Sequence, residues 1–377
     1  MCRFAVYLIV LIVLAGADCR PATASDVLRR ELSGLAKEIL SVIKDDQMQD
    51  SIAIGEFTGD PNLASNAGPG ISEMLRSLLE EAQPGIVKRG SPLSLRGVFD
   101  ESPDPKDKDQ TIVKVTATIT AKGGSKIDEK FAVIRETGTV AELLGVTVAL
   151  PPKATKEKRN EEIRARIKEP EFHQTGTRIS TKAGSPFAIE LLVTTKDKAP
   201  RDQDGWDSIP ARPVQDRDGE CFVDIRRDEV FAIRLHNQAL VEAAASIAID
   251  GLDVFTFSEF RDPVTKRPRF QHFLVRPEGA RTIVGWHRTN EQADSFVVTE
   301  YAKSAAGQDP RVSRGSQGML TVTFAFAWEG DNVPDEEKGS RDGGNGTGFG
   351  PPVKSRQKTV KRSVGVVRDV ISVRYTR

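Results

Sequence analysis

The spacing of the apolar residues changes near residue 150, and this change constrains the fold more than any other feature of the sequence. Before it, two segments carry apolar residues at steps of three and four, which predicts amphipathic helices. After residue 186, apolar and polar residues alternate in many short runs, which predicts strands. We therefore expect an N-terminal α/β unit followed by a β-rich unit. The helical positions are Leu28, Leu32, Leu35, Ile39 and Ile43 in the first segment, and Ile71, Met74, Leu75, Leu78 and Leu79 in the second.

Strands complete the N-terminal unit. Residues 51–57 form a short apolar run between the two helices, and residues 111–122 alternate apolar with polar. Gly123-Gly124 then predicts a turn into a second strand at 130–135. Thr139 and Glu142 have the spacing of a capping box, in which hydroxyl and carboxylate each bind a backbone N–H, so a short helix is expected there.

A charged segment separates the two units. Pro151-Pro152 is followed by residues 153–169, in which Ile163 and Ile167 alone offer an apolar face. We expect a solvated linker helix that ends at Pro170. The predicted organisation is a signal peptide at 1–24, an α/β domain at 25–150, a charged linker at 151–185 and a β domain at 186–377.

The C-terminal pattern is typical of an antiparallel β-sandwich of immunoglobulin-like or jelly-roll topology. Asp250-Gly251 predicts a tight turn, because both residues tolerate positive φ. Cys221 stands before an apparent strand and is expected in the core. The fold class is thus α+β or β: a small mixed sheet, then the sandwich. The alternating runs are 189–193, 231–235, 247–249, 273–275, 283–284, 296–298, 320–324 and 364–375.

A glycine-rich stretch near the C-terminus looks like a ligand-binding motif. Residues 342–350 contain five glycines, but Pro351-Pro352 prevents a helix from following, so dinucleotide geometry fails. Thr347 stands where a calcium-binding repeat needs Asp, and no second copy exists. We interpret 329–358 as a polar, flexible loop between two strands.

The N-terminus carries the marks of export. Arg3 precedes an apolar run, residues 4–15, which is too short to span a bilayer and is followed by small residues. Cleavage after Ala24 is preferred over cleavage after Ala17. Lipidation at Cys19 is disfavoured, because the three residues before it fit that signal poorly. We expect a periplasmic or secreted protein without a stable transmembrane span.

The N-terminal unit resembles a bacterial envelope family. The resemblance rests on residues 52–57, the helix at 70–79 and the Gly123-Gly124 hairpin, and it covers roughly residues 26–150. The family includes the N-terminal domain of the TolB translocation protein, the curli-export lipoprotein and the lipoproteins that activate penicillin-binding proteins. It implies partner binding and assembly at the envelope without catalysis. No residue of this chain is matched to a contact residue of the family.

Catalytic and metal-binding motifs are weak throughout the sequence. The histidines, His173, His236, His272 and His287, have no metal-ligand spacing, although His272 and His287 could meet across neighbouring strands beside Glu278 or Asp250. No serine has the spacing of a nucleophile elbow. We therefore predict no catalytic residue, no cofactor and no metal.

An aromatic and basic group offers the only candidate ligand-binding residues. Trp286, His287 and Tyr301 could present a stacking surface for a sugar or peptide, whereas the competing interpretation makes Trp286 a core residue with its N–H bonded. Residues 353–377 carry an excess of basic side chains that could attract acidic polymers.

The balance of acidic and basic residues reduces the number of plausible functions. Lys plus Arg and Asp plus Glu both total 54, which argues against a dedicated nucleic-acid binder. The sequence predicts an exported, non-catalytic binding or scaffolding protein of the bacterial envelope, whose partner is an envelope protein or polysaccharide. The alternative is a carbohydrate-active or metal-assisted hydrolase in the sandwich.

Overall fold

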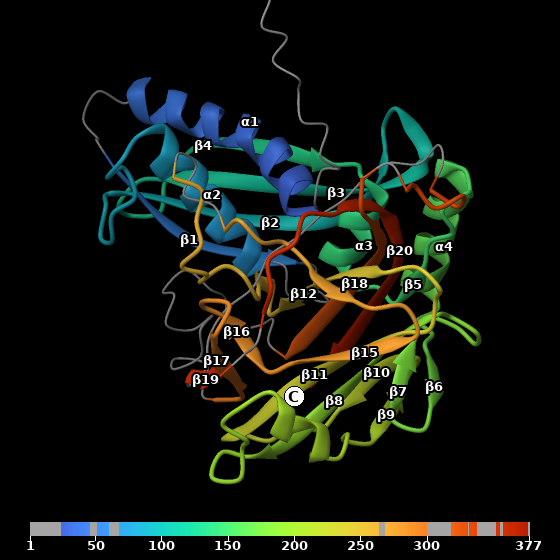
Figure 1. The fold of residues 1–377 in the computed structure, drawn as a ribbon. Coiled ribbons are helices and arrows are strands. Elements are labelled where there is room, and N and C mark those ends of the chain that lie inside the picture. The colour runs from blue at the N-terminus through green and yellow to red at the C-terminus, as the bar shows by residue number, and fades with distance from the viewer. Residues whose placement is uncertain are drawn as a thin grey trace, which may run out of the picture.

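The structure, a computed structural model, describes residues 24–45, 51–59, 68–263, 268–299, 318–330, 332–337, 352–354 and 357–375. Strands dominate these residues and helices are few, which confirms the expected α+β or β class at that level. Figure 1 shows a helix-covered sheet at the top and two larger sheets below it. The predicted leader, residues 1–24, lies outside the described residues except for Ala24, and so do residues 338–351, which hold the glycine-rich stretch.

The N-terminal unit packs two helices against a four-stranded sheet. Both predicted amphipathic helices are present, and Leu32 and Leu75 of their apolar stripes are wholly buried. The strand order is β1-β2-β3-β4, in which β1 and β2 are parallel and the other pairs are antiparallel. The elements are α1 (Ala24–Asp45), β1 (Ile52–Gly59), α2 (Gly68–Ala82), β2 (Leu93–Asp104), β3 (Asp107–Thr120), β4 (Lys126–Ile134) and α3 (Thr137–Leu144).

Two features of this unit differ from the sequence prediction. Strand β2 was not predicted, although Leu93, Leu95 and Phe99 lie buried on its core face. The capping box at Thr139 and Glu142 is wrong, because α3 begins earlier and its cap is Glu136, whose carboxylate accepts the N–H groups of Gly138 and Thr139. Glu142 instead accepts a hydrogen bond from Thr323 Oγ1 at 3.2 Å.

The C-terminal half forms two larger sheets. Within the described residues, one has the order β13-β12-β18-β20-β10-β9, with β14 and β5 attached, and the other has the order β16-β17-β11-β8-β7-β6, with β15 and β19 attached. Their strands are β5 (Val148–Ala149), β6 (His173–Thr175), β7 (Arg178–Ser180), β8 (Phe187–Thr195), β9 (Val214–Arg217), β10 (Glu220–Val223), β11 (Glu229–Asn237), β12 (Ala243–Ile249), β13 (Leu252–Asp253), β14 (Phe273–Val275), β15 (Gly279–Ile283), β16 (Gly285–His287), β17 (Gln292–Val297), β18 (Met319–Trp328), β19 (Pro352–Lys354) and β20 (Ser363–Arg374).

The two sheets face one another across a shared apolar core. Phe187 of β8 stacks on Phe324 of β18 with ring centroids 4.9 Å apart, so an aromatic pair joins the layers. The Asp250-Gly251 turn forms as predicted, with φ of 53° and 76°. The pairing is not wholly antiparallel, because β10 runs parallel to β20. Cys221, which was expected in the core, is buried and has a free thiol.

Strand β20 belongs to both halves of the molecule. Val367 and Val370 pack into the core of the N-terminal unit, whereas Ile371 and Val373 pack between the two larger sheets. A register shift opposite Phe324 and Ala325 inserts an extra residue in β20, and such a bulge re-aims the side chains that follow. β5 pairs with β20 as well, which ties the end of the N-terminal unit to this strand.

The segment predicted as a charged linker is packed along one face. Its helix, α4 (Lys156–Lys168), buries Ile163 completely, and Arg159 donates a hydrogen bond to the carbonyl oxygen of Val367 at 3.1 Å. The helix is therefore not solvated all round. β6 and β7, which follow it, already form part of a larger sheet.

Truncation of a core leucine tests whether the two halves unfold together. Leu75→Ala removes contacts only in the N-terminal core and should cost about 2–5 kcal/mol. All three tryptophans, Trp206, Trp286 and Trp328, lie in the C-terminal half. If β20 couples the halves, the urea midpoint read by tryptophan fluorescence should fall in this variant, with a smaller fall for the partly buried Leu78→Ala. An unchanged midpoint would mean that the halves unfold independently.

Candidate functional site

A cavity of about 710 Å³ opens beside β15 in the C-terminal half. Its walls come from β14, β15, the short 3₁₀ helix η1 (Asp204–Ser208), His287 of β16 and residues 357–362, which lead into β20. The chain passes from one large sheet to the other between β14 and β15, with Glu278 at φ 48°. The cavity thus lies where a crossover leaves β15 exposed along one edge.

One wall of the cavity is aromatic. Phe255 and Phe270 surround His287, with ring centroids 5.1 and 5.3 Å from the imidazole. The register of the β16–β17 hairpin fixes His287, which stands opposite Ala293. These rings offer flat apolar faces to a ligand.

His287 is held neutral by its surroundings. Burial lowers the pKa of its imidazole to about 4, although a hydrogen bond with Asn290 acts in the opposite direction. Its Nδ1 lies 3.2 Å from Ser258 Oγ, which also accepts the N–H of Phe260. Ser258 is only 1% exposed. This serine–histidine contact therefore holds the loop after β13 in place.

The charged groups of the cavity are unequally matched. Five cationic side chains and three acidic ones line it. Glu242 accepts from Arg362 Nε at 2.7 Å, and Asp207 pairs with Arg234 at 3.3 Å, so two of these acids are already engaged. The cavity wall as a whole is cationic. Its charged residues are Arg234, Arg276, Arg281, Lys358, Arg362, Asp204, Asp207 and Glu242.

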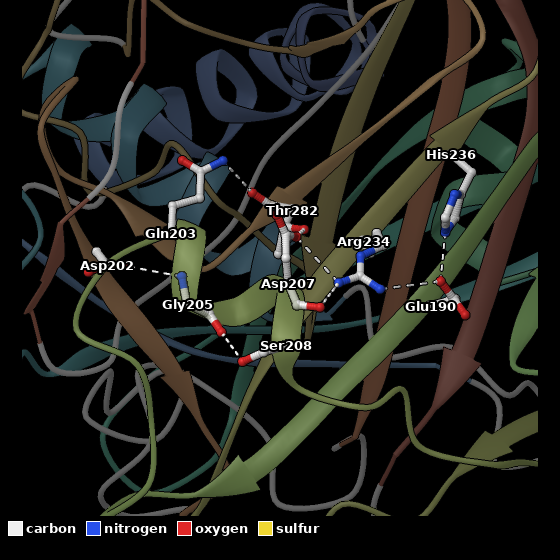
Figure 2. Close-up of polar contacts among 9 residues, drawn as sticks. All are labelled: Glu190, Asp202, Gln203, Gly205, Asp207, Ser208, Arg234, His236 and Thr282. Atoms are coloured by element: carbon white, nitrogen blue, oxygen red, sulfur yellow. Dashed lines mark hydrogen bonds and ion pairs between the residues drawn. The ribbon is translucent and has the colours of Figure 1, made fainter.

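A chain of polar contacts on the outer side of β8 and β11 fixes η1 against the cavity. Figure 2 shows Arg234 between Asp207 and Glu190, with His236 beyond Glu190. Nε2 of His236 lies 2.8 Å from Glu190 Oε2, and Thr282 Oγ1 donates to Asp207 Oδ1 at 3.0 Å. Burial acts to raise the pKa of Glu190, but hydrogen bonds from Thr177 and His236 hold it below its usual value.

The residues proposed as a stacking surface are separated. His287 lines the cavity, but Trp286 points into the core, where its ring meets Phe296 edge-on at 5.0 Å. The indole N–H of Trp286 is buried without an acceptor among the described residues, whereas a bonded N–H was expected. Tyr301 lies outside the described residues.

The hypothetical metal ligands are also dispersed. His272 and His287 both line the cavity, whereas Glu278 lines a neighbouring hollow with His236. Asp250 is committed to the β12–β13 turn, where it accepts the N–H of Gly318 and the hydroxyl of Tyr375. Within the part of the chain that the structure describes, no group of three or more His, Cys, Asp or Glu side chains is placed to hold a metal ion.

Arg281 lines the cavity, but the sequence analysis did not identify it as a candidate site residue. It lies in β15, where its alternation with Thr282 looks like that of any half-buried strand. Its partners come from Leu274 and Gln357, and the distance of Gln357 along the chain leaves no local signal.

Comparison of the chain with protein families, curated proteins and solved structures finds no match. None of the helices that the structure describes has the length and the apolar sequence of a membrane-spanning segment. The function must therefore be inferred from the cavity itself.

The low pKa of His287 predicts acid sensitivity. The unfolded chain takes up a proton near pH 6.5, but the folded chain does so only near pH 4, so stability is lost as the pH falls between these values. Between pH 7.5 and 4.5 this one group should cost roughly 2–3 kcal/mol. His287→Gln should lose that part of the pH dependence in urea unfolding. Parallel pH profiles for the two proteins would contradict the assignment.

Proposed function

We propose that the chain is an exported, non-catalytic binding protein of the bacterial envelope and that the cavity beside β15 is its ligand site. The observation that carries the proposal is the composition of the cavity wall: aromatic faces on one side and a surplus of cationic groups on the other. A volume of about 710 Å³ suits a small ligand, since such sites usually measure about 300–1,000 Å³.

The way in which the titratable groups are used supports binding without catalysis. A general acid or base must reach its substrate with a pKa suited to proton transfer. His287 is neutral, 3% exposed and bound to Ser258, while Asp207 and Glu242 are each paired with an arginine. These three groups are therefore engaged in contacts that shape the wall of the cavity.

The N-terminal unit supplies the envelope part of the proposal. Its order of helix, strand, helix, strands and short helix supports the resemblance to the envelope family of TolB-like and curli-export-like domains. We propose that it forms a domain over residues 25–150 that contacts an envelope partner, while the C-terminal β-sandwich binds the ligand. Export through the leader at 1–24, and thus a periplasmic or secreted location, belongs to the same proposal.

A dye titration tests the ligand site. The probe is 8-anilinonaphthalene-1-sulfonate, an aromatic anion whose fluorescence rises in apolar surroundings. We expect saturable binding to a single site that Val360→Trp weakens tenfold or more, because Val360 is a 42% exposed wall residue and the larger ring fills space. Leu240→Trp is the matched control, since Leu240 is 81% exposed and does not line the cavity.

Two results would overturn the proposal. Equal dye binding by the chain and its Val360→Trp variant would place the dye elsewhere. Release of 4-nitrophenol from 4-nitrophenyl glycosides or esters, lost in Val360→Trp and kept in Leu240→Trp, would identify the cavity as a hydrolase site.

A further inference from the structure

Arg281 is a half-buried residue of β15 whose side chain lines the cavity. One terminal nitrogen of its guanidinium donates to the carbonyl oxygen of Leu274 at 2.9 Å, and the other donates to Oε1 of Gln357. The guanidinium carbon lies 5.6 Å from the centroid of the Phe273 ring. These contacts hold the guanidinium in place and use two of the five N–H groups that an arginine carries.

The charge of Arg281 is not neutralised by the residues around it. Among the described residues, no carboxylate oxygen lies within 4.0 Å of its guanidinium, and the acid whose charge acts on its pKa, Glu242, is bound by Arg362 Nε at 2.7 Å. Two guanidinium groups therefore share one carboxylate. Burial lowers the pKa of Arg281, which shows that its charged form has lost part of its hydration. A fixed guanidinium with a net positive charge around it favours a bound anion.

Two more cations stand at the rim of the cavity. Arg276 and Lys358 are exposed, line the cavity, and make no ion pair with any described residue. Their positive field attracts anions from solution. Because water and salt screen exposed charges, each of them should contribute less to binding than the half-buried Arg281.

An aromatic ring lies on the same wall as this charge. Phe270 meets His287 and Phe260 in T-shaped contacts, with ring centroids 5.3 and 5.5 Å apart, and it remains only half-buried where it lines the cavity. An inorganic anion would contact the guanidinium alone. An anion that carries a ring would in addition remove apolar surface of its own and of Phe270 from water, which favours binding.

We infer that the cavity selects organic anions that carry an apolar ring, with the anionic group on Arg281 and the ring against Phe270. This inference rests on the proposed function and names the ligand class of the same site. A guanidinium accepts carboxylate and phosphate oxygens alike, so the class is defined by its negative charge and its ring. Arg281 is then the residue that distinguishes an anion from an uncharged ring compound.

Two dyes that differ by one charged group test this inference. 8-Anilinonaphthalene-1-sulfonate carries a sulfonate, and N-phenyl-1-naphthylamine has the same ring skeleton without it. In fluorescence titrations the chain should bind the sulfonate about ten- to a hundredfold more tightly, the range expected for hydrogen bonds to a charged group. The uncharged dye is the more apolar of the two, so burial of apolar surface alone would give the opposite preference.

Variants of the charged wall residues locate the interaction. Arg281→Gln should lose the preference for the sulfonate, and Arg281→Lys should keep part of it, since the charge remains without the fork of N–H groups. Glu242→Gln should increase the preference, because Arg281 and Arg362 then no longer share a carboxylate. Arg276→Gln, the matched control at the rim, should change it by less than about threefold.

The ratio of the two affinities is the quantity to compare between variants. Partial unfolding would expose apolar surface and raise the binding of both dyes, whereas loss of the anion contact lowers the binding of the sulfonate alone. Urea midpoints close to that of the parent chain would show that the variants fold.

Competition against the bound dye identifies the anionic group. 1-Naphthoate and 1-naphthyl phosphate present a carboxylate and a phosphate on the same ring, and 1-naphthalenemethanol is their uncharged counterpart. Displacement by either anion at concentrations at which the alcohol has no effect supports the inference, and the better competitor shows which anion the site prefers.

Several results would overturn the inference. These are equal binding of the two dyes, an unaltered preference in Arg281→Gln, a preference lost in Arg276→Gln instead, or equal displacement by 1-naphthalenemethanol. If both dyes bind equally and Val360→Trp weakens both, the inference fails and the proposed binding function stands. If neither dye binds, both fail.

Discussion

The packing of β20 is the constraint on which the rest of the structure depends. This strand is central in one large sheet, and its Val367 and Val370 also pack into the core of the N-terminal unit. Because successive side chains of a strand point to opposite faces, Val370 packs in one core and Ile371 in the other, and the bulge near Arg368 places Val367 on the same side as Val370. Glu337 secures the bulge, since its buried carboxylate accepts from Val366 N and Arg368 Nε. β20 thus joins the N-terminal unit to the two larger sheets.

The geometry of the cavity depends on how β20 is packed. Residues 357–362 form one wall and continue directly into β20, so the attachment of β20 also positions Gln357 and Arg362. The opposite wall is set by η1, which Asp207, Arg234 and Thr282 hold against β11 and β15. A preformed cavity of this kind binds with a small cost in ordering its own side chains.

Periodic elements could be predicted from the sequence, and contacts between distant segments could not. The stripes of α1 and α2, the alternation of β3, β8, β11 and β18, and the Asp250-Gly251 turn all have local signals. β2 was missed because Gly97 leaves one position of its core face without an apolar side chain and Val98 is apolar on its exposed face. The cap of α3 was misplaced because Glu136, earlier in the chain, accepts the Thr139 N–H that the predicted capping box assigned to Glu142. His287 was singled out for its aromatic neighbour Trp286, yet the aromatic rings that face it are Phe255 and Phe270. Arg281 was not singled out, because its surroundings are set by Gln357 and by the Glu242–Arg362 pair, which lie far from it along the chain.

The position of a bound aromatic anion tests the central claim most directly. A crystal structure of the chain with 8-anilinonaphthalene-1-sulfonate should show the dye inside the cavity beside β15, with a ring against Phe270. Dye bound only outside the cavity would contradict the account.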